Sequence, residues 1–151
     1  MTADAFKFPF QKMLDVKEKQ ERVLQIRLSE VDGAILRKQA DVERWQDVRR
    51  RLLEELRRAR SGGDLELNAY CTRYMRHVRG QIASLCRQAR ELEQDRERVR
   101  RELEKTLQSR KALENYRDRL RREFLADQER SEERIVELHS ISKFSRAKRV
   151  S

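Results

Sequence analysis

The chain has 151 residues, of which 42% are charged and only 37% are hydrophobic. A compact enzyme of this length buries a large apolar core, and this composition has too little apolar mass to form one. The 37 Lys and Arg residues outnumber the 27 Asp and Glu residues, which gives a formal net charge of +10. Such a charge attracts nucleic acid, anionic lipid or an acidic protein surface, and does not by itself choose among them.

The first predicted element is a helix over residues 9–60, preceded by a short lead over residues 1–8. Pro9 is tolerated in a first helical turn because the N–H that proline lacks would have no partner there. From Phe10 to Ala59 a set of mostly apolar positions recurs with alternating steps of four and three, the 3.5-residue period of a left-handed coiled-coil seam. These positions are Phe10, Leu14, Lys17, Glu21, Leu24, Leu28, Val31, Ile35, Lys38, Val42, Trp45, Arg49, Leu52, Leu56 and Ala59.

The helical pattern of the body of the chain breaks at residues 61–64, where two glycines are followed by Asp64. Glycine readily adopts a positive φ, and an Asp side chain can cap the first turn of a following helix. We therefore expect a hairpin turn at this place. A turn centred between the two glycines brings together residues whose numbers sum to about 125, so Phe10 is expected close to Asn115.

A second helix is predicted over residues 65–142, followed by a basic, flexible tail over residues 143–151. Its seam has the same alternation except around Val78, where two steps of four follow each other. Such a stutter unwinds the supercoil locally. The seam positions are Leu67, Cys71, Tyr74, Val78, Ile82, Leu85, Ala89, Leu92, Arg96, Val99, Leu103, Thr106, Arg110, Leu113, Arg117, Leu120 and Phe124.

The stutter leaves the place of one stripe of side chains open. Tyr70, Tyr74, Val78 and Ile82 follow one another at intervals of four, and a pure row of this kind drifts off a 3.5-residue seam. The stripe can belong to the seam near the turn, or it can rotate outward and form an apolar contact patch. The pattern alone does not decide between these two interpretations.

The second helix is longer than the first, with about 80 residues against about 50, or roughly 120 Å against 75 Å. Beyond Asn115 we therefore expect an overhang without a partner from its own chain. The overhang still carries apolar side chains that an isolated helix would expose to water, which indicates a binding partner. These side chains are Leu120, Phe124, Ile135, Leu138, Ile141 and Phe144.

Two further expectations concern single residues. Trp45 is expected opposite Gly80, where the absence of a side chain would make room for the indole. Cys71 and Cys86 lie on one helix, about 22 Å apart by the helical rise, so they cannot form a disulfide within one molecule. Free thiols are typical of a reducing compartment.

No pattern of residues indicates an enzyme, a cofactor or a metal ion. Phosphate-binding loops, nucleophile elbows and zinc-binding spacings are all lacking, and His77 and His139 are too far apart to form a ligand pair on one helix face. The basic run over residues 49–51 is followed by two glutamates and lacks aromatic residues that stack on bases, so no nucleic acid is expected. No stretch is apolar enough to span a membrane, and the first four residues do not resemble a secretory signal, so a cytoplasmic protein is expected.

Three segments of the chain form a recognisable combination. A short apolar lead is followed by a stretch rich in Leu, Val, Lys and Glu, in Phe6-Lys7-Phe8-Pro9-Phe10-Gln11-Lys12-Met13-Leu14-Asp15-Val16-Lys17-Glu18-Lys19. The turn is followed by Tyr70, Tyr74-Met75, Val78 and Ile82, and a charged helix follows Leu113-Glu114-Asn115-Tyr116-Arg117. These segments resemble the flagellar export protein FliJ family, and the resemblance covers essentially the whole chain, including its length and the unequal arms.

The resemblance implies an all-α, antiparallel two-helix coiled-coil hairpin that hydrolyses nothing. It implies a stalk that binds the flagellar export ATPase ring, links it to the membrane export-gate protein and escorts export chaperones, at the cytoplasmic side of the membrane. The implied gate-binding residues are Tyr74, Val78, Gln81 and Leu85. The implied ATPase-binding residues are Phe10, Leu14, Leu120 and Phe124.

Three alternative functions remain open at this level. The stalk proteins of virulence type III secretion share the architecture. A basic coiled-coil module that binds nucleic acid or an anionic membrane surface would account for the charge, and its binding would weaken steeply with salt. A structural rod would self-assemble, with the overhang after Phe124 pairing with its own copy.

Overall fold

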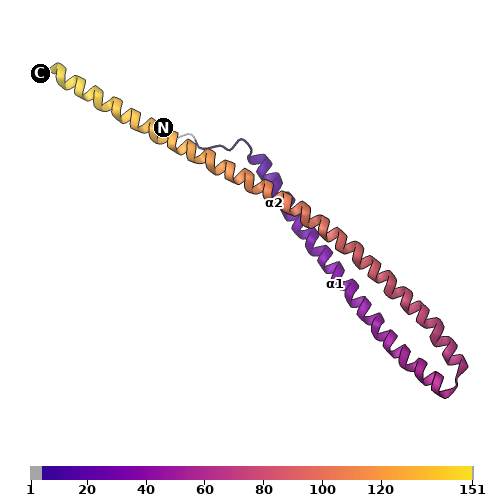
Figure 1. Ribbon diagram of the computed structural model, residues 1–151. Coiled ribbons are helices and arrows are strands. Elements are labelled where there is room, and N and C mark those ends of the chain that lie inside the picture. The colour runs from indigo at the N-terminus through magenta and orange to yellow at the C-terminus, as the bar shows by residue number, and fades with distance from the viewer. Residues whose placement is uncertain (1–4, 151) are drawn as a thin grey trace. The chain divides into compact units, whose positions relative to one another are not determined.

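The computed structural model describes residues 5–150, and this part of the chain consists of two α-helices and no strand. Helix α1 spans Gln11–Gly62 and helix α2 spans Leu65–Val150 (Figure 1). The predicted fold class, an all-α antiparallel two-helix hairpin with a longer second helix, is confirmed. Residues 1–4 of the predicted lead and Ser151 of the predicted tail lie outside the described residues.

The helix boundaries differ from the expected ones by a few residues. Helix α1 begins at Gln11 and continues through Gly62, one of the two glycines assigned to the turn. Helix α2 continues past residue 142 to Val150, so the described part of the predicted tail is helical with exposed side chains. Flexibility of this segment in solution stays a prediction.

The chain divides into two compact units. We call Glu21–Lys105 the turn unit, and we call residues 5–20 together with residues 106–150 the terminal unit. The turn unit contains most of α1 and the first part of α2. The terminal unit contains the lead, the first turns of α1 and the rest of α2. The two units are described separately.

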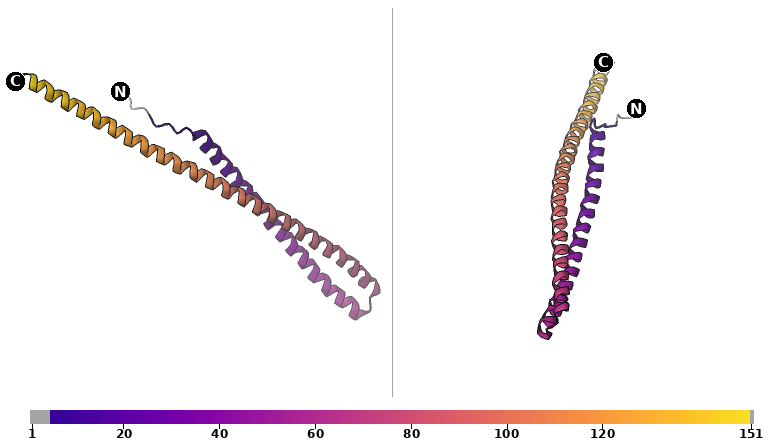
Figure 2. Two further views of the ribbon diagram at one scale, coloured as in Figure 1. Left: turned by 45° about the horizontal axis from the view of Figure 1, so that its top comes forward. Right: turned by 90° about the vertical axis from the view of Figure 1, so that its right-hand side faces the viewer.

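The turn unit is held together by a small apolar core between the two helices. Leu52 of α1 packs with Cys71, Met75 and Val78 of α2, and the exposed fraction of Val78 is 0%. In both views of Figure 2, the magenta parts of α1 and α2 run antiparallel beside each other away from the turn. Half-buried side chains surround this core; they are Trp45, Val48, Leu56, Leu67, Tyr74 and Ile82.

The predicted seam is the buried face of the turn unit. On α1 every predicted position from Glu21 to Ala59 is buried or half-buried except Arg49, which is exposed. Its neighbour Val48 packs against the core instead, because an apolar side chain gains more from that place than a guanidinium group. On α2 every predicted position from Leu67 to Leu103 is buried or half-buried.

The turn follows from the chemistry of three residues. Gly63 adopts a φ of 69°, in the left-handed region that side chains disfavour. The N–H of Asp64 donates to the carbonyl of Ala59 at 3.0 Å, the long bond of a Schellman motif at the end of α1. The Asp64 side chain then accepts a hydrogen bond from the N–H of Leu67 at 3.0 Å, which caps the start of α2.

The terminal unit is held together mainly by aromatic side chains. Phe8 of the lead is buried, and its ring lies 6.1 Å from that of Tyr116, between centroids. The Phe10 ring lies 6.0 Å from the same tyrosine, next to the predicted neighbour Asn115, which confirms the predicted register. Leu14 is completely buried, with an exposed fraction of 0%.

The expectation that α2 has no partner beyond Asn115 is wrong. The Phe6 ring contacts the Phe124 ring, with 5.7 Å between centroids. Residues 5–8 of the lead are not helical, and an extended residue advances up to about 3.3 Å, more than twice the 1.5 Å of a helix. A few residues of the lead therefore cover two turns of α2.

The predicted pairing of Trp45 with Gly80 is also wrong. The indole lies edge-on against His77, with 5.7 Å between ring centroids. A Cβ atom added at Gly80 would meet no atom within 4 Å, so this glycine borders open space and makes no room for another side chain. The rule that facing residues have numbers summing to about 125 locates the partner of Trp45 only to within one helical turn. The stutter shifts the contact by three residues, from Gly80 to His77.

Candidate functional site

The four predicted gate-binding residues follow one another along α2 in the turn unit. Val78 is completely buried in the core with Leu52 and Cys71, and Tyr74, Gln81 and Leu85 are half-buried. These four residues therefore face α1, and a partner that approaches the closed hairpin reaches only the exposed parts of the half-buried ones. Direct contact through Val78 would require the two helices to separate.

The structure decides the interpretation that the stutter left open. Met75 is buried beside Tyr74 and Val78, so the seam widens at the stutter and keeps both rows of side chains inside. Of the row that begins at Tyr70 and continues at intervals of four, only Tyr70 itself points outward, since it is 60% exposed. Its ring lies parallel to that of Tyr74, with 6.3 Å between centroids and an interplanar angle of 6°.

Four rings form a continuous row across the edge of the two helices. Tyr70 stacks on Tyr74, the Tyr74 ring lies 5.9 Å from that of His77, and His77 meets Trp45 of α1. We call these four residues the aromatic row. Sequence reasoning missed it, although the intervals of four and three between Tyr70, Tyr74 and His77 place them on one helix face.

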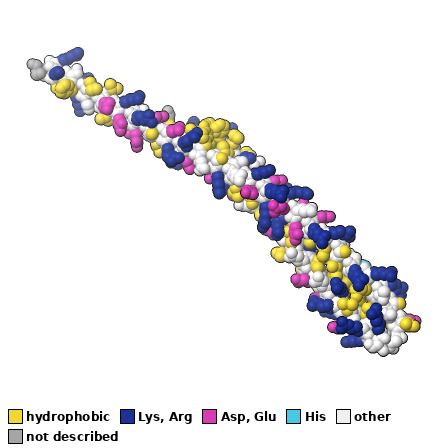
Figure 3. Space-filling model, in the orientation of Figure 1, with side chains coloured by type: hydrophobic (Ala, Val, Ile, Leu, Met, Phe, Trp, Pro, Cys, Tyr) yellow, Lys and Arg dark blue, Asp and Glu magenta, His cyan; other side chains and the backbone are white. Residues whose placement is uncertain are grey.

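A basic surface lies on α2 in the same unit. Residues 67–90 contain five arginines and no Asp or Glu, and all five arginines are exposed. None of the five forms an ion pair with a described residue, since the ion pairs of the turn unit lie elsewhere, for example between Arg96 and Asp32 at 3.6 Å. Figure 3 shows Lys and Arg side chains crowded around the turn. We call this set the arginine face; it consists of Arg73, Arg76, Arg79, Arg87 and Arg90.

The four predicted ATPase-binding residues all lie in the terminal unit. Leu14 is buried, Leu120 is half-buried, and Phe124 is half-buried beneath the ring of Phe6. Phe10 is 41% exposed and contacts Tyr116. The structure thus places the four residues in one unit, three of them buried or half-buried within it.

Within residues 5–150 no three His, Cys, Asp or Glu side chains lie close enough together to hold a metal ion. Neither described helix is long and apolar enough to cross a membrane. Cys71 and Cys86 are free thiols, the first buried in the core of the turn unit and the second half-buried.

The described residues define the class of protein, which is a two-helix antiparallel coiled-coil hairpin with exposed apolar, aromatic and basic surfaces. The chain belongs to the flagellar FliJ protein family, because the profile of that family matches residues 6–149. Members of this family are structural components of the flagellar type III export apparatus rather than enzymes. No curated protein and no solved structure matches the chain.

Proposed function

We propose that this protein is a stalk of the flagellar export apparatus that binds the export ATPase ring with one part and the membrane export-gate protein with another, and that it also escorts export chaperones. The match to the family over residues 6–149 carries the proposal. The separation of exposed surfaces between the two units supports it. The aromatic row and the arginine face lie in the turn unit, whereas the exposed end of α2 belongs to the terminal unit.

The gate contact is assigned to the exposed side chains at the edge of the predicted gate-binding residues. Val78 is closed off by α1, so binding energy in the closed hairpin must come from Tyr70, Tyr74 and the neighbouring arginines. Aromatic and arginine side chains dominate the energetics of many protein interfaces. Gln81 and Leu85, which are half-buried, would contribute at the border of the same contact.

The ATPase contact is assigned to the terminal unit. Phe10 is the most exposed of the four predicted residues and offers direct contact, while Leu14 would act by holding α1 against α2. Leu120 and Phe124 would act in the same way, by keeping the lead in place. Peripheral placement at the cytoplasmic side of the membrane follows from binding to the apparatus.

The test is co-purification of the full chain with the export ATPase hexamer and, separately, with the cytoplasmic part of the gate protein. Changing Tyr70 and Tyr74 to alanine should weaken gate binding and leave ATPase binding intact. Changing Phe10 to alanine, the most exposed of the four assigned residues, should weaken ATPase binding and leave gate binding intact. Exchange of Leu36 for alanine, an exposed residue of α1 away from both surfaces, is the control. If the intact chain binds neither partner at low salt with nucleotide present, the proposal fails.

The arginine face favours one alternative, a module that binds nucleic acid or an anionic membrane surface. Five exposed arginines in a stretch that contains no Asp or Glu would release counterions on binding, so affinity would fall steeply with salt. Titration of single-stranded RNA and of anionic vesicles at two salt concentrations separates this function from the first. Tight binding to either, with no binding to the ATPase or the gate protein, would favour the alternative.

A further inference from the structure

The lead lies along α2 and is attached to it by aromatic rings. We call residues 5–10 the aromatic strap. Its Phe6 ring contacts that of Phe124 with 5.7 Å between centroids, and its Phe8 ring contacts that of Tyr116 at 6.1 Å. Within the described part of the chain no hydrogen bond joins the strap to α2, since its backbone bonds lead back to the start of α1. Side-chain packing therefore holds the strap in place.

The first turns of α1 add one apolar contact to this attachment. Among residues 11–20 only Leu14 is buried. The other side chains that are partly covered there are Lys17 and Glu18, whose charged groups gain little from leaving water. The core of the turn unit, by contrast, has four buried apolar side chains on its two helices. This end of α1 is therefore held more weakly than the part near the turn.

The facing part of α2 is polar as well. Thr106 is 8% exposed, and Arg110 is half-buried. The confirmed register brings Arg110 within about one turn of Lys17. The guanidinium group of Arg110 donates to the carboxylate of Glu114 at 2.8 Å, and both side chains belong to α2, so this ion pair survives separation of the two helices. Polar side chains regain water on separation, so separating the helices at this level loses little free energy.

We propose that the aromatic strap and residues 11–20 open from α2 as one cooperative unit while the turn unit stays closed. Weakly packed parts of a protein open locally at a lower free energy than global unfolding. A helix of ten residues is not stable on its own, so release of the strap and melting of the first turns of α1 occur together. The part of α2 that loses its cover becomes an isolated, charged helix and frays in the same event.

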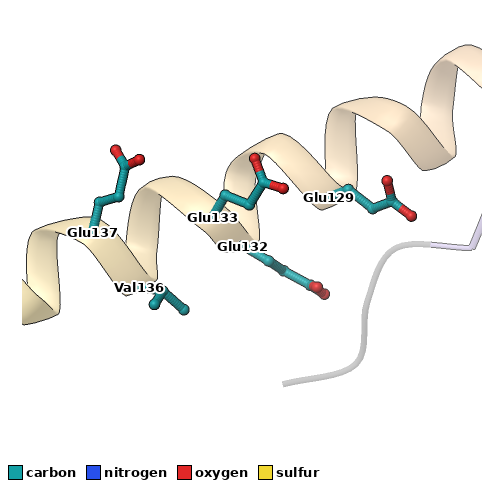
Figure 4. A pocket seen from close by; sticks show the side chains of 5 residues that line it. All are labelled: Glu129, Glu132, Glu133, Val136 and Glu137. Carbon is teal, nitrogen blue, oxygen red and sulfur yellow. The ribbon is translucent and has the colours of Figure 1, made fainter.

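Opening lengthens the part of α2 that no described segment supports. In the closed form every residue from 129 to 150 is exposed, and Figure 4 shows Glu133 and Glu137 pointing to one side of this stretch and Val136 to the other. At 1.5 Å per residue this free arm spans about 33 Å. After opening, the arm begins near Thr106 and spans about 68 Å where it remains helical. The strap therefore sets the length of the free arm.

Opening also exchanges the surface that the terminal unit offers. The closed strap presents Phe10, which is 41% exposed, whereas opening uncovers Leu14 and Phe124. A partner that binds through Phe10 stabilises the closed form, and one that binds the uncovered face stabilises the open form. For the ATPase contact this consequence rests on the function proposed above. The opening itself is a property of the free chain.

Native-state amide hydrogen exchange of the full chain, without a partner and at several low urea concentrations, tests the proposal. Amides of residues 15–20 and 107–124 should exchange through one opening event with a common dependence on urea. Their protection should be at least about tenfold lower than that of residues 48–56 and 74–82 in the turn unit. Equal protection in the two units overturns the proposal. So does protection that rises residue by residue along each helix without a common opening.

A variant and its matched control test the role of the strap. Phe124→Ala removes the partner of Phe6 and should lower protection about tenfold in both ranges of the terminal unit, with a change of less than about twofold in the turn unit. Leu125→Ala alters the next residue of α2, which is 49% exposed, and should change protection less than about twofold. Unchanged protection of the turn unit shows that the hairpin remains folded.

Phe6→Ala removes the same ring contact from the side of the strap and should reproduce the effect of Phe124→Ala. Its result is decisive if Phe124→Ala disturbs the whole chain. A change confined to residues 107–124, with residues 15–20 as protected as in the wild type, would mean that the two segments do not open together and would overturn the proposal. An effect of Leu125→Ala as large as that of Phe124→Ala would also overturn it, since the strap would then have no special part in the opening.

Discussion

Two stretches of one helix, α2, show how differently similar sequences are used in this protein. Around Val78 the apolar side chains are buried against α1, and the exposed fraction of Val78 is 0%. Around Val136 the apolar side chains are just as large, but the exposed fraction of Val136 is 63%. The difference lies in whether another helix covers the face, and not in the residues themselves.

The largest expected effect separates these two stretches directly. Val78→Asp would bury an unpaired carboxylate in the core of the turn unit and should lower the free energy of unfolding by about 3 kcal/mol or more. Val136→Asp places the same group in water and should change it by less than about 0.5 kcal/mol. Urea denaturation followed by circular dichroism measures both. Similar losses for the two variants would contradict the burial difference.

A second comparison involves phenylalanines of the terminal unit. Phe8 is 8% exposed and packs on Tyr116, whereas Phe144 is 67% exposed. Phe8→Ala should lower the local stability of this unit by up to about 3 kcal/mol, as loss of a buried aromatic ring does elsewhere. Faster amide hydrogen exchange over residues 11–20 and 106–124 would report it. Phe144→Ala is the control and should leave exchange in those ranges unchanged.

Two glycines should respond to alanine with opposite signs. Gly63→Ala forces a side chain into the left-handed region and should destabilise the hairpin by about 1–2 kcal/mol. Gly80→Ala adds a methyl group to open space within α2 and should stabilise it by up to about 1 kcal/mol. Thermal denaturation of the two variants checks this. Destabilisation by Gly80→Ala would contradict the open space beside this glycine, because the added methyl group would then have to meet an atom of the hairpin itself.

The smallest expected effect concerns the start of α2. Asp64→Ala removes the hydrogen bond to the N–H of Leu67 and should cost about 1 kcal/mol. Asp64→Asn keeps an acceptor at the same place and should cost little. Denaturation of the two variants beside the wild type is the measurement. Equal losses would mean that the cap depends on the charge rather than on the hydrogen bond.

Much of the fold could be predicted from the sequence because the seam positions are periodic and the break is unambiguous. The alternation of four and three identified buried positions on both helices, and the two glycines with Asp64 identified the turn. Arg49 was misplaced because period alone does not weigh a charged side chain against its apolar neighbour Val48. The path of the lead was missed because a short non-helical segment has no periodicity.

The candidate site was less predictable. The predicted gate-binding and ATPase-binding residues were implied by family resemblance. The burial of Val78 and Leu14 inside the hairpin became visible only in three dimensions. The aromatic row joins Trp45 of α1 to His77 of α2, and such a contact across helices depends on the exact register. A shift of three residues, within the reach of one stutter, would have placed another side chain against the indole.

The sequence by itself determined that this protein is helical, that it folds back at one turn, and that its charge lies on solvated faces. These properties follow from local periodicity, turn chemistry and composition, which act within a few residues along the chain. Tertiary structure alone decided which of the apolar side chains are covered, because burial requires a second helix or the lead to lie beside the same turn of the helix. That is why Phe124 is sheltered by Phe6 while Leu138 is exposed.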